Sequence, residues 1–154
     1  MLGFPLLLAA VAAAFALADD GGASLLPDGP GKEIIAKACT ECHSVDRMRG
    51  LRLSKDDWWD KINDMVDRGA KATDQESEAM VDYLVRNFGK ESKVWVNTAP
   101  MVEFKSVLGF TVHESEAVVA YRQANGKFTG PADLLKVPGI DPKKVDAKKD
   151  FMLF

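Results

Sequence analysis

The chain contains few of the side chains that build metal clusters or covalent cross-links. Among its 154 residues are two cysteines, Cys39 and Cys42, and two histidines, His43 and His113. A structural zinc site needs four thiolate or imidazole ligands close together. Since His113 is alone and far along the chain from the other three residues, the sequence argues against structural zinc.

The chain also lacks an excess of positive charge. It has 20 Lys and Arg against 23 Asp and Glu, a net charge of -3, so the overall balance does not point to nucleic acid or to an anionic membrane. The two halves differ in sign, however. Residues 19–91 carry 11 basic and 16 acidic side chains, whereas residues 93–154 carry 9 basic and 7 acidic ones. This length and composition suit one compact domain or two very small ones.

Only one long apolar run is present, at residues 2–18. It is short and alanine-rich for a membrane span, and it ends in Ala16-Leu17-Ala18, a small-x-small cleavage pattern. We therefore predict a signal peptide over residues 1–18 and a flexible Gly/Pro-rich linker over residues 19–30. The protein is then periplasmic or otherwise exported, with no obligatory membrane insertion. An uncleaved N-terminal membrane anchor is the alternative.

The two cysteines form the sequence "ACTECHSV", a Cys-x-x-Cys-His motif. A redox dithiol of the thioredoxin type would follow a strand, but the residues before Cys39 place Ile34, Ala38 and Cys42 on one helical face. Cys-x-x-Cys-His is the signature of c-type haem attachment. Two thiols on one helical turn can bond the same porphyrin, and the imidazole that follows can reach its iron. We predict covalent haem c at Cys39, Cys42 and His43, with a redox dithiol as the alternative.

Two amphipathic helices are predicted after this motif. The first begins with a Ser54–Asp57 capping box and ends near Gly69. The second begins at Thr73 or Asp74 and ends at Phe88. Of the two adjacent tryptophans, Trp58 and Trp59, we expect one to pack in the core and the other to be partly exposed.

The stretches "CTECHSVDRMRG", "WWDKINDMVDRGA" and "TDQESEAMVDYLVRNFG" resemble a small class I cytochrome c domain over about residues 30–90. The resemblance implies a haem domain at residues 31–91, with His43 and Met65 as the axial ligands of the iron. It also implies single-electron transfer to a redox partner protein rather than an enzymatic activity. Other candidates for the sixth iron position are Met80, Met101, His113 or an open site.

Three arginines follow the haem motif: Arg47, Arg49 and Arg52. We expect them to pair with haem propionates, to dock an acidic redox partner, or to belong to a solvated loop.

Beyond residue 93 the chain contains two similar units, "SVLGFTVHESEAVVAY" and "KVPGIDPKKVDAKKDF". Each has an apolar-x-Gly-apolar stretch followed by a fresh helix, which is typical of a helix-hairpin-helix. With "VNTA" and "AYRQANGKF", residues 94–154 resemble the helix-hairpin-helix domain of ComEA-like competence proteins. In that family the hairpins bind duplex DNA through phosphates, and the same fold also serves as a protein-docking module.

Two departures from the family pattern weaken the DNA interpretation. Thr111 and Asp141 stand where a second glycine is usual in each hairpin, and we expect Asp141 to cap the helix that starts at Pro142. The second hairpin is locally basic, and its lysines are Lys143, Lys144, Lys148 and Lys149. A charge balance of only +2 for this half predicts weak, salt-sensitive DNA binding.

The sequence thus predicts an all-α protein with a cytochrome c-like domain followed by a small helix-hairpin-helix domain. Its predicted function is single-electron transfer by an exported c-type cytochrome whose second domain is a docking module. Two alternatives stay open: a DNA-binding, competence-type protein that carries an accessory haem, and a haem sensor with an open sixth site.

Overall fold

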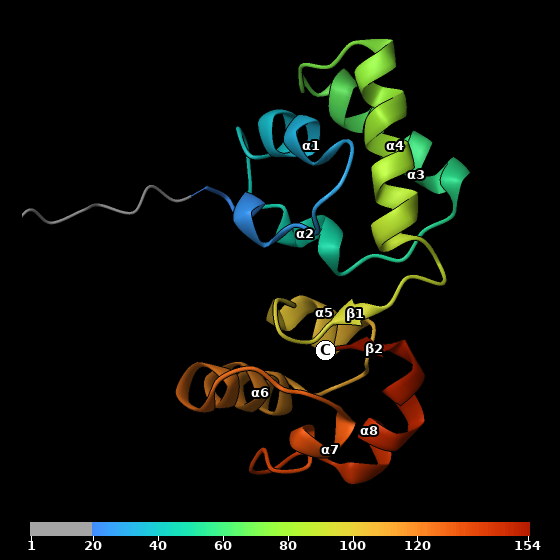
Figure 1. The fold of residues 1–154 in the computed structure, drawn as a ribbon. Helices are drawn as coiled ribbons and strands as arrows, with labels where there is room; N and C mark the ends of the chain where they lie inside the picture. Colours follow the sequence, from blue (N-terminus) through green and yellow to red (C-terminus); the bar gives the residue numbers. More distant parts are fainter. Residues whose placement is uncertain (1–19) are drawn as a thin grey trace, which may run out of the picture.

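The computed structural model describes residues 20–154 and confirms the all-α prediction. The chain forms an N-terminal and a C-terminal helical unit, drawn one above the other in Figure 1. The predicted signal peptide, residues 1–18, lies outside the described residues.

The N-terminal unit contains four α-helices: α1 (Lys32–Cys39), α2 (Asp46–Arg49), α3 (Lys55–Asp67) and α4 (Asp74–Phe88). The long helix α4 packs against both α3 and α1. Trp58 is buried and its indole N–H donates to the carbonyl oxygen of Phe88 at 3.1 Å, whereas Trp59 is half-buried. The predicted difference between the two tryptophans is confirmed.

Capping boxes define where α3 and α4 begin. The Ser54 hydroxyl accepts from the N–H of Asp57, and the Asp57 carboxylate accepts from the N–H of Ser54. Thr73 and Glu76 make the same pair of bonds at the start of α4. Each box satisfies two backbone donors that a helix start otherwise leaves unpaired. Because these bonds span only three residues, the local sequence predicted both starts correctly.

Helix α1 ends earlier than the sequence predicts. Its last residue is Cys39, and the Thr40 hydroxyl then donates to the carbonyl oxygen of Ala36 at 2.6 Å. Cys42 therefore lies in the turn after the helix and is exposed, so placing it on the apolar helical face was wrong.

Residues 20–30 pack on the N-terminal unit, which the prediction of a flexible linker did not anticipate. Leu26 is buried in the core, and the Tyr83 hydroxyl donates to the carbonyl oxygen of Pro27 at 2.7 Å. A short 3₁₀-helix, η1 (Ala23–Leu25), precedes Leu26. The apolar side chain of Leu26 gives this Gly/Pro-rich segment a contact that its composition does not reveal.

The C-terminal unit contains two helical hairpins. The first joins α5 (Met101–Ser106) to α6 (Val112–Asn125), and the second joins α7 (Pro131–Leu134) to α8 (Pro142–Lys148). Strand β1 (Val94–Trp95) pairs in parallel with β2 (Met152–Leu153), which follows the 3₁₀-helix η2 (Lys149–Phe151). This pairing brings the beginning and the end of the unit together, beside α5 in Figure 1.

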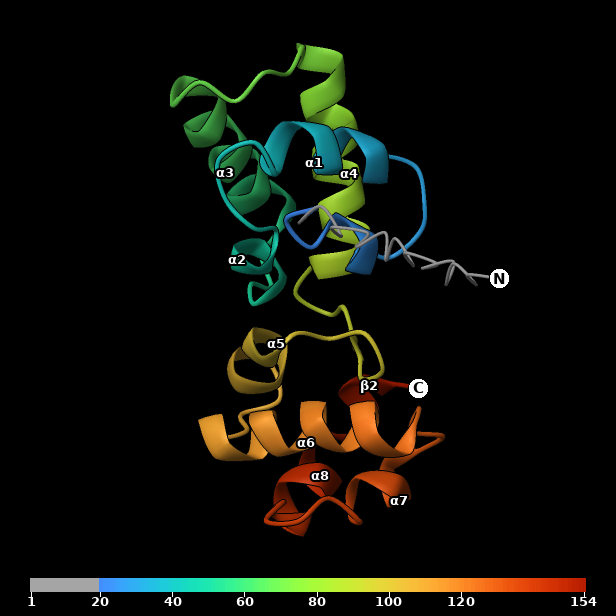
Figure 2. The same cartoon turned by 90° about the vertical axis from the view of Figure 1, so that its left-hand side faces the viewer.

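The two units are joined by a buried ion cluster where α2 lies next to α5 (Figure 2). Glu103 of α5 accepts from Arg49 Nε at 2.8 Å and from Arg52 Nη2 at 3.0 Å. Arg49 and Glu103 are 1% and 2% exposed. Arg52 also donates to the carbonyl oxygen of Ser92 in the connecting segment at 3.0 Å. Arg49 and Arg52 therefore bind the C-terminal unit, and expecting them in a solvated loop or on a partner-docking surface was wrong.

Candidate functional site

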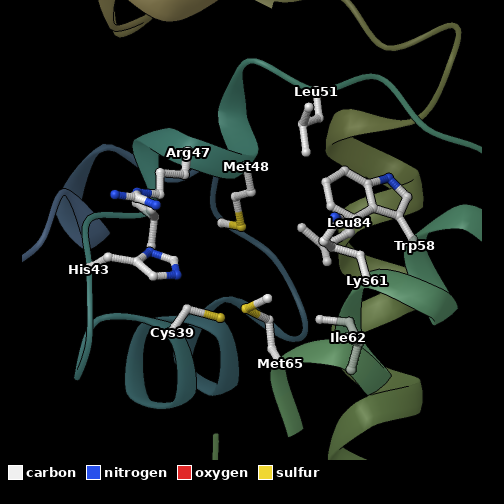
Figure 3. Close-up of a pocket in the computed structure, with 11 residues that line it drawn as sticks. Cys39, His43, Arg47, Met48, Leu51, Trp58, Lys61, Ile62, Met65 and Leu84 are labelled. Atoms are coloured by element: carbon white, nitrogen blue, oxygen red, sulfur yellow. The ribbon is translucent and has the colours of Figure 1, made fainter. Parts of the chain in front are cut away.

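The N-terminal unit contains an apolar hollow between α1, α2 and α3, with a volume of about 240 Å³. Figure 3 shows the sulfur atoms of Cys39, Met48 and Met65 directed toward its interior. Its other lining residues are His43, Val45, Arg47, Leu51, Trp58, Lys61, Ile62 and Leu84. Three of the four residues that the sequence predicted as haem contacts thus lie around one hollow.

The two cysteines have different surroundings. Cys39 lines the hollow, and burial raises the pKa of its thiol to about 11. Cys42 is exposed and is not among the lining residues. A thiol with a raised pKa is a poor nucleophile at neutral pH, because the thiolate is the reactive form. This disfavours the redox-dithiol alternative.

The residues proposed for a sixth iron ligand have different surroundings. Met65 lines the hollow, whereas Met80 is 2% exposed in the helical core, and Met101 and His113 belong to the C-terminal unit. Met48, which was not among the predicted candidates, also lines the hollow. Met48 belongs to the short helix α2, which was not predicted from the sequence.

The described residues 20–154 contain no group of three or more His, Cys, Asp and Glu side chains placed to hold a metal ion. His43 Nδ1 lies 2.9 Å from the carbonyl oxygen of Ser44, which leaves its Nε2 without a protein partner in the described part of the chain. Arg47 lines the hollow and is exposed, unlike the other two arginines of its cluster.

The tips of the two hairpins form the second candidate site. Gly109 and Gly139 occupy the turns with φ of 72° and 81°, the left-handed region that glycine adopts without strain. Both are exposed, and neither backbone N–H has a hydrogen-bond partner within residues 20–154. No atom lies within 4 Å of the point where a Cβ of Gly109 would be. Both turns can therefore be approached closely by a ligand that accepts hydrogen bonds.

The residues that replace the second glycine of each hairpin are caps. The Thr111 hydroxyl accepts from the N–H of Glu114 at 3.1 Å, and the Asp141 carboxylate accepts from the N–H of Lys143 at 2.9 Å. The capping prediction for Asp141 is confirmed. Its carboxylate is hydrogen-bonded to the backbone at the start of α8.

The four lysines of the second hairpin are not equivalent. Lys144 pairs with the buried Glu114 at 2.6 Å, Lys149 pairs with Asp146 at 2.9 Å, and the Lys148 ammonium lies 5.2 Å from the centre of the Phe151 ring. Lys143 is exposed and has no ion-pair partner among the described residues. The second hairpin therefore offers one free lysine beside its turn.

Comparisons with known proteins identify the C-terminal unit. The helix-hairpin-helix motif family matches residues 89–153. The chain is 38% identical over 61 residues to ComE operon protein 1 of Bacillus subtilis, a match that covers 40% of this chain and 30% of that protein. An uncharacterized protein of Haemophilus influenzae is 32% identical over 89 residues, which cover 54% of this chain and 80% of that protein. No solved structure matches.

These matches overturn the classification of the chain as an electron-transfer cytochrome c. The family match extends through the whole C-terminal unit. Neither relative reported above is named a cytochrome. Within residues 20–154 no helix is long and apolar enough to cross a membrane. The chain belongs to the same family as the H. influenzae protein, and its residues 89–153 are a helix-hairpin-helix motif.

Proposed function

We propose that the chain is an exported protein that binds duplex DNA through its C-terminal unit, in a process of the DNA-uptake kind. The observation that carries this proposal is the pair of open glycine turns within a unit that matches the helix-hairpin-helix motif. The similarity to ComE operon protein 1 supports it. The matched region covers 30% of the length of that relative.

The chemistry of the hairpins suits phosphate oxygens. The N–H groups of Gly109 and Gly139 point from exposed turns and can donate to a phosphate, a contact that carries no base preference. Lys143 adds one free positive charge beside the second turn. Because residues 93–154 carry 9 basic and 7 acidic side chains, the affinity is low at physiological salt, since most non-specific DNA affinity comes from neutralised phosphates.

Fluorescence anisotropy with a labelled DNA duplex tests this proposal. We expect binding at low salt that weakens steeply as salt rises and that is the same for duplexes of unrelated sequence. A duplex of equal length with methylphosphonate linkages is the matched control, because it keeps the bases and removes the charge. Absence of binding to the normal duplex at low salt would refute the proposal.

A covalent haem at Cys39, Cys42 and His43 stays a prediction, as an accessory group of this DNA-binding protein. The apolar hollow supports it, because Cys39 and His43 lie on its wall and Met48 and Met65 direct thioether sulfurs into it. Cys42 directly precedes His43 in the chain and is exposed, which leaves its thiol accessible for a bond to the same group. A bound haem would supply an iron centre with His43 as one ligand.

The pyridine haemochrome spectrum and the intact mass of the exported protein test this prediction. We expect one attached haem in the wild type and none in a Cys39→Ala, Cys42→Ala double variant. Met65→Ala beside Met48→Ala then shows which thioether contacts the iron, because only loss of a ligand changes the ligand-field bands. An unmodified mass for the exported wild type would refute the prediction while leaving DNA binding untouched.

A further inference from the structure

Equivalent positions of the two hairpins meet at one carboxylate. Thr111 and Asp141 both stand two residues after the turn glycine of their hairpin, and both donate their backbone N–H to Glu114, at 2.6 Å and 3.1 Å. Lys144 occupies the position in the second hairpin that Glu114 occupies in the first, three residues after Asp141 and Thr111 respectively. The Lys144 Nζ atom lies 2.6 Å from Oε2 of Glu114, so the two side chains form an ion pair.

Glu114 is enclosed by these partners. The residue is 5% exposed, and its two oxygens accept three hydrogen bonds, from Thr111, Asp141 and Lys144. Although burial raises the pKa of this carboxyl, the hydrogen bonds outweigh burial and lower the pKa to about 2. The carboxylate is therefore charged at neutral pH, and a buried charge is stable only while these partners stay in place.

The first turn of α6 also touches the second hairpin directly. The His113 Nε2 atom lies 3.6 Å from the point where a Cβ of Gly139 would be. The start of α6 and the second glycine turn thus lie next to each other. The bonds from Thr111 and Asp141 to the one carboxylate of Glu114 hold the residues that follow the two turns close together.

We propose that Glu114 is a positioning residue that fixes the two hairpin turns to each other, so that both reach the phosphates of one DNA duplex together. The inference rests on the proposed DNA binding. A cap for α6 alone would involve Thr111 and nothing beyond it. The bonds to Asp141 and Lys144 cross 27 and 30 residues, and only a link between the hairpins explains them.

The variant Glu114→Gln tests the inference, because electrostatics and positioning predict opposite changes in DNA affinity. Electrostatics alone predicts tighter DNA binding, because the variant loses a negative charge and frees Lys144. Loss of positioning predicts the opposite, because an amide cannot accept all three hydrogen bonds. We expect about 5- to 10-fold weaker binding of the duplex at fixed salt, at the low end of the effects typical of coupled sites.

Thr111→Ala is the matched control, since it removes the cap of α6 and leaves the bonds from Asp141 and Lys144 to Glu114. Amide hydrogen exchange of Asp141, followed by NMR without DNA, is the second readout. We expect it to accelerate in Glu114→Gln and to stay slow in Thr111→Ala. Lys144→Met is expected to weaken binding and to accelerate the exchange of Asp141 together, because it leaves the buried Glu114 carboxylate without its ion-pair partner.

The outcomes separate the two proposals. Binding by Glu114→Gln that equals or exceeds that of Thr111→Ala overturns the inference and leaves DNA binding intact, as does unchanged exchange at Asp141. Loss of binding in Lys144→Met with slow exchange at Asp141 also overturns it, because Lys144 would then contact DNA itself. No binding by the wild type at low salt refutes the proposed function and this inference together.

Discussion

The two helical units differ in how their apolar side chains pack. The C-terminal unit closes its core around thirteen buried hydrophobic residues from Val94 to Met152, and its hairpins are linked by a partly buried ion pair between Lys144 and Glu114. The N-terminal unit surrounds an apolar hollow and directs three sulfur atoms into it. The closed unit is the one that matches a known family, and the DNA proposed for it would bind on its surface. The hollow unit has room for a group inside.

The joint between the units gives the largest expected effect. Glu103→Ala would leave Arg49 and Arg52 buried without their carboxylate, and breaking a buried pair in this way costs about 3–5 kcal/mol. We expect a matching loss in the free energy of unfolding measured in urea, and loss of the fixed arrangement of the units. Glu116→Ala, at an exposed position of α6, is the control and should change stability by less than about 0.5 kcal/mol. Equal stability of the two variants would contradict the buried joint.

The difference in core packing can be tested with one residue type in both units. Met152 is 5% exposed in the closed core, so Met152→Ala should cost about 2–5 kcal/mol of unfolding free energy. Met65 borders the hollow and is half-buried, so Met65→Ala should cost only about 1 kcal/mol. Thermal unfolding followed by circular dichroism measures both. A larger loss for Met65 than for Met152 would mean that the hollow is filled and supports the fold.

Acid should weaken the C-terminal unit through Glu114. Its pKa of about 2 in the folded protein lies below the value of 4.5 for a free glutamate. The carboxylate therefore contributes stability that is complete above the unfolded value and is lost as pH falls from about 5 toward 2. We expect a loss of about 1–3 kcal/mol over this range, measured by urea unfolding at each pH. Glu114→Gln should lack this part of the pH dependence.

The smallest expected effect comes from comparing one lysine of each unit for its contribution to DNA binding. Lys143→Met should lower the slope of log affinity against log salt by about 0.9 and weaken binding a few-fold, because one phosphate contact is lost. Lys71→Met, at an exposed position of the N-terminal unit, removes the same charge away from the hairpins and should leave the slope unchanged. Anisotropy titrations at four or five salt concentrations measure both. An equal change of slope in the two variants would place the DNA elsewhere than at the hairpin turns.

Local chemistry explains which parts were predictable. The starts of α3 and α4 depend on capping boxes that span three residues, and the hairpin turns depend on Gly109 and Gly139. Such features depend on residues that are close together in sequence. The position of Met48 at the hollow and the burial of Leu26 depend on contacts between segments that are far apart in sequence, and neither was predicted.

The arginines that follow the Cys-x-x-Cys-His motif show which contacts a local sequence pattern cannot predict. Three arginines within six positions suggested a solvated or ligand-facing group, but Arg49 and Arg52 meet a carboxylate that lies more than fifty residues away in sequence. No local pattern identifies Glu103 as their partner. The position of α5 against α2 decides it.

The sequence by itself determined the starts of α3 and α4, the two glycine turns, the Cys-x-x-Cys-His motif and the sign of charge in each half, because capping, backbone preference and charge are properties of neighbouring residues. Only the tertiary structure decided that Cys42 lies outside α1 in an exposed turn, that one lysine of four is free beside the second turn, and that Glu114 joins both hairpins. These depend on burial and on pairing between distant residues, since a buried charge must find its partner wherever the fold brings one.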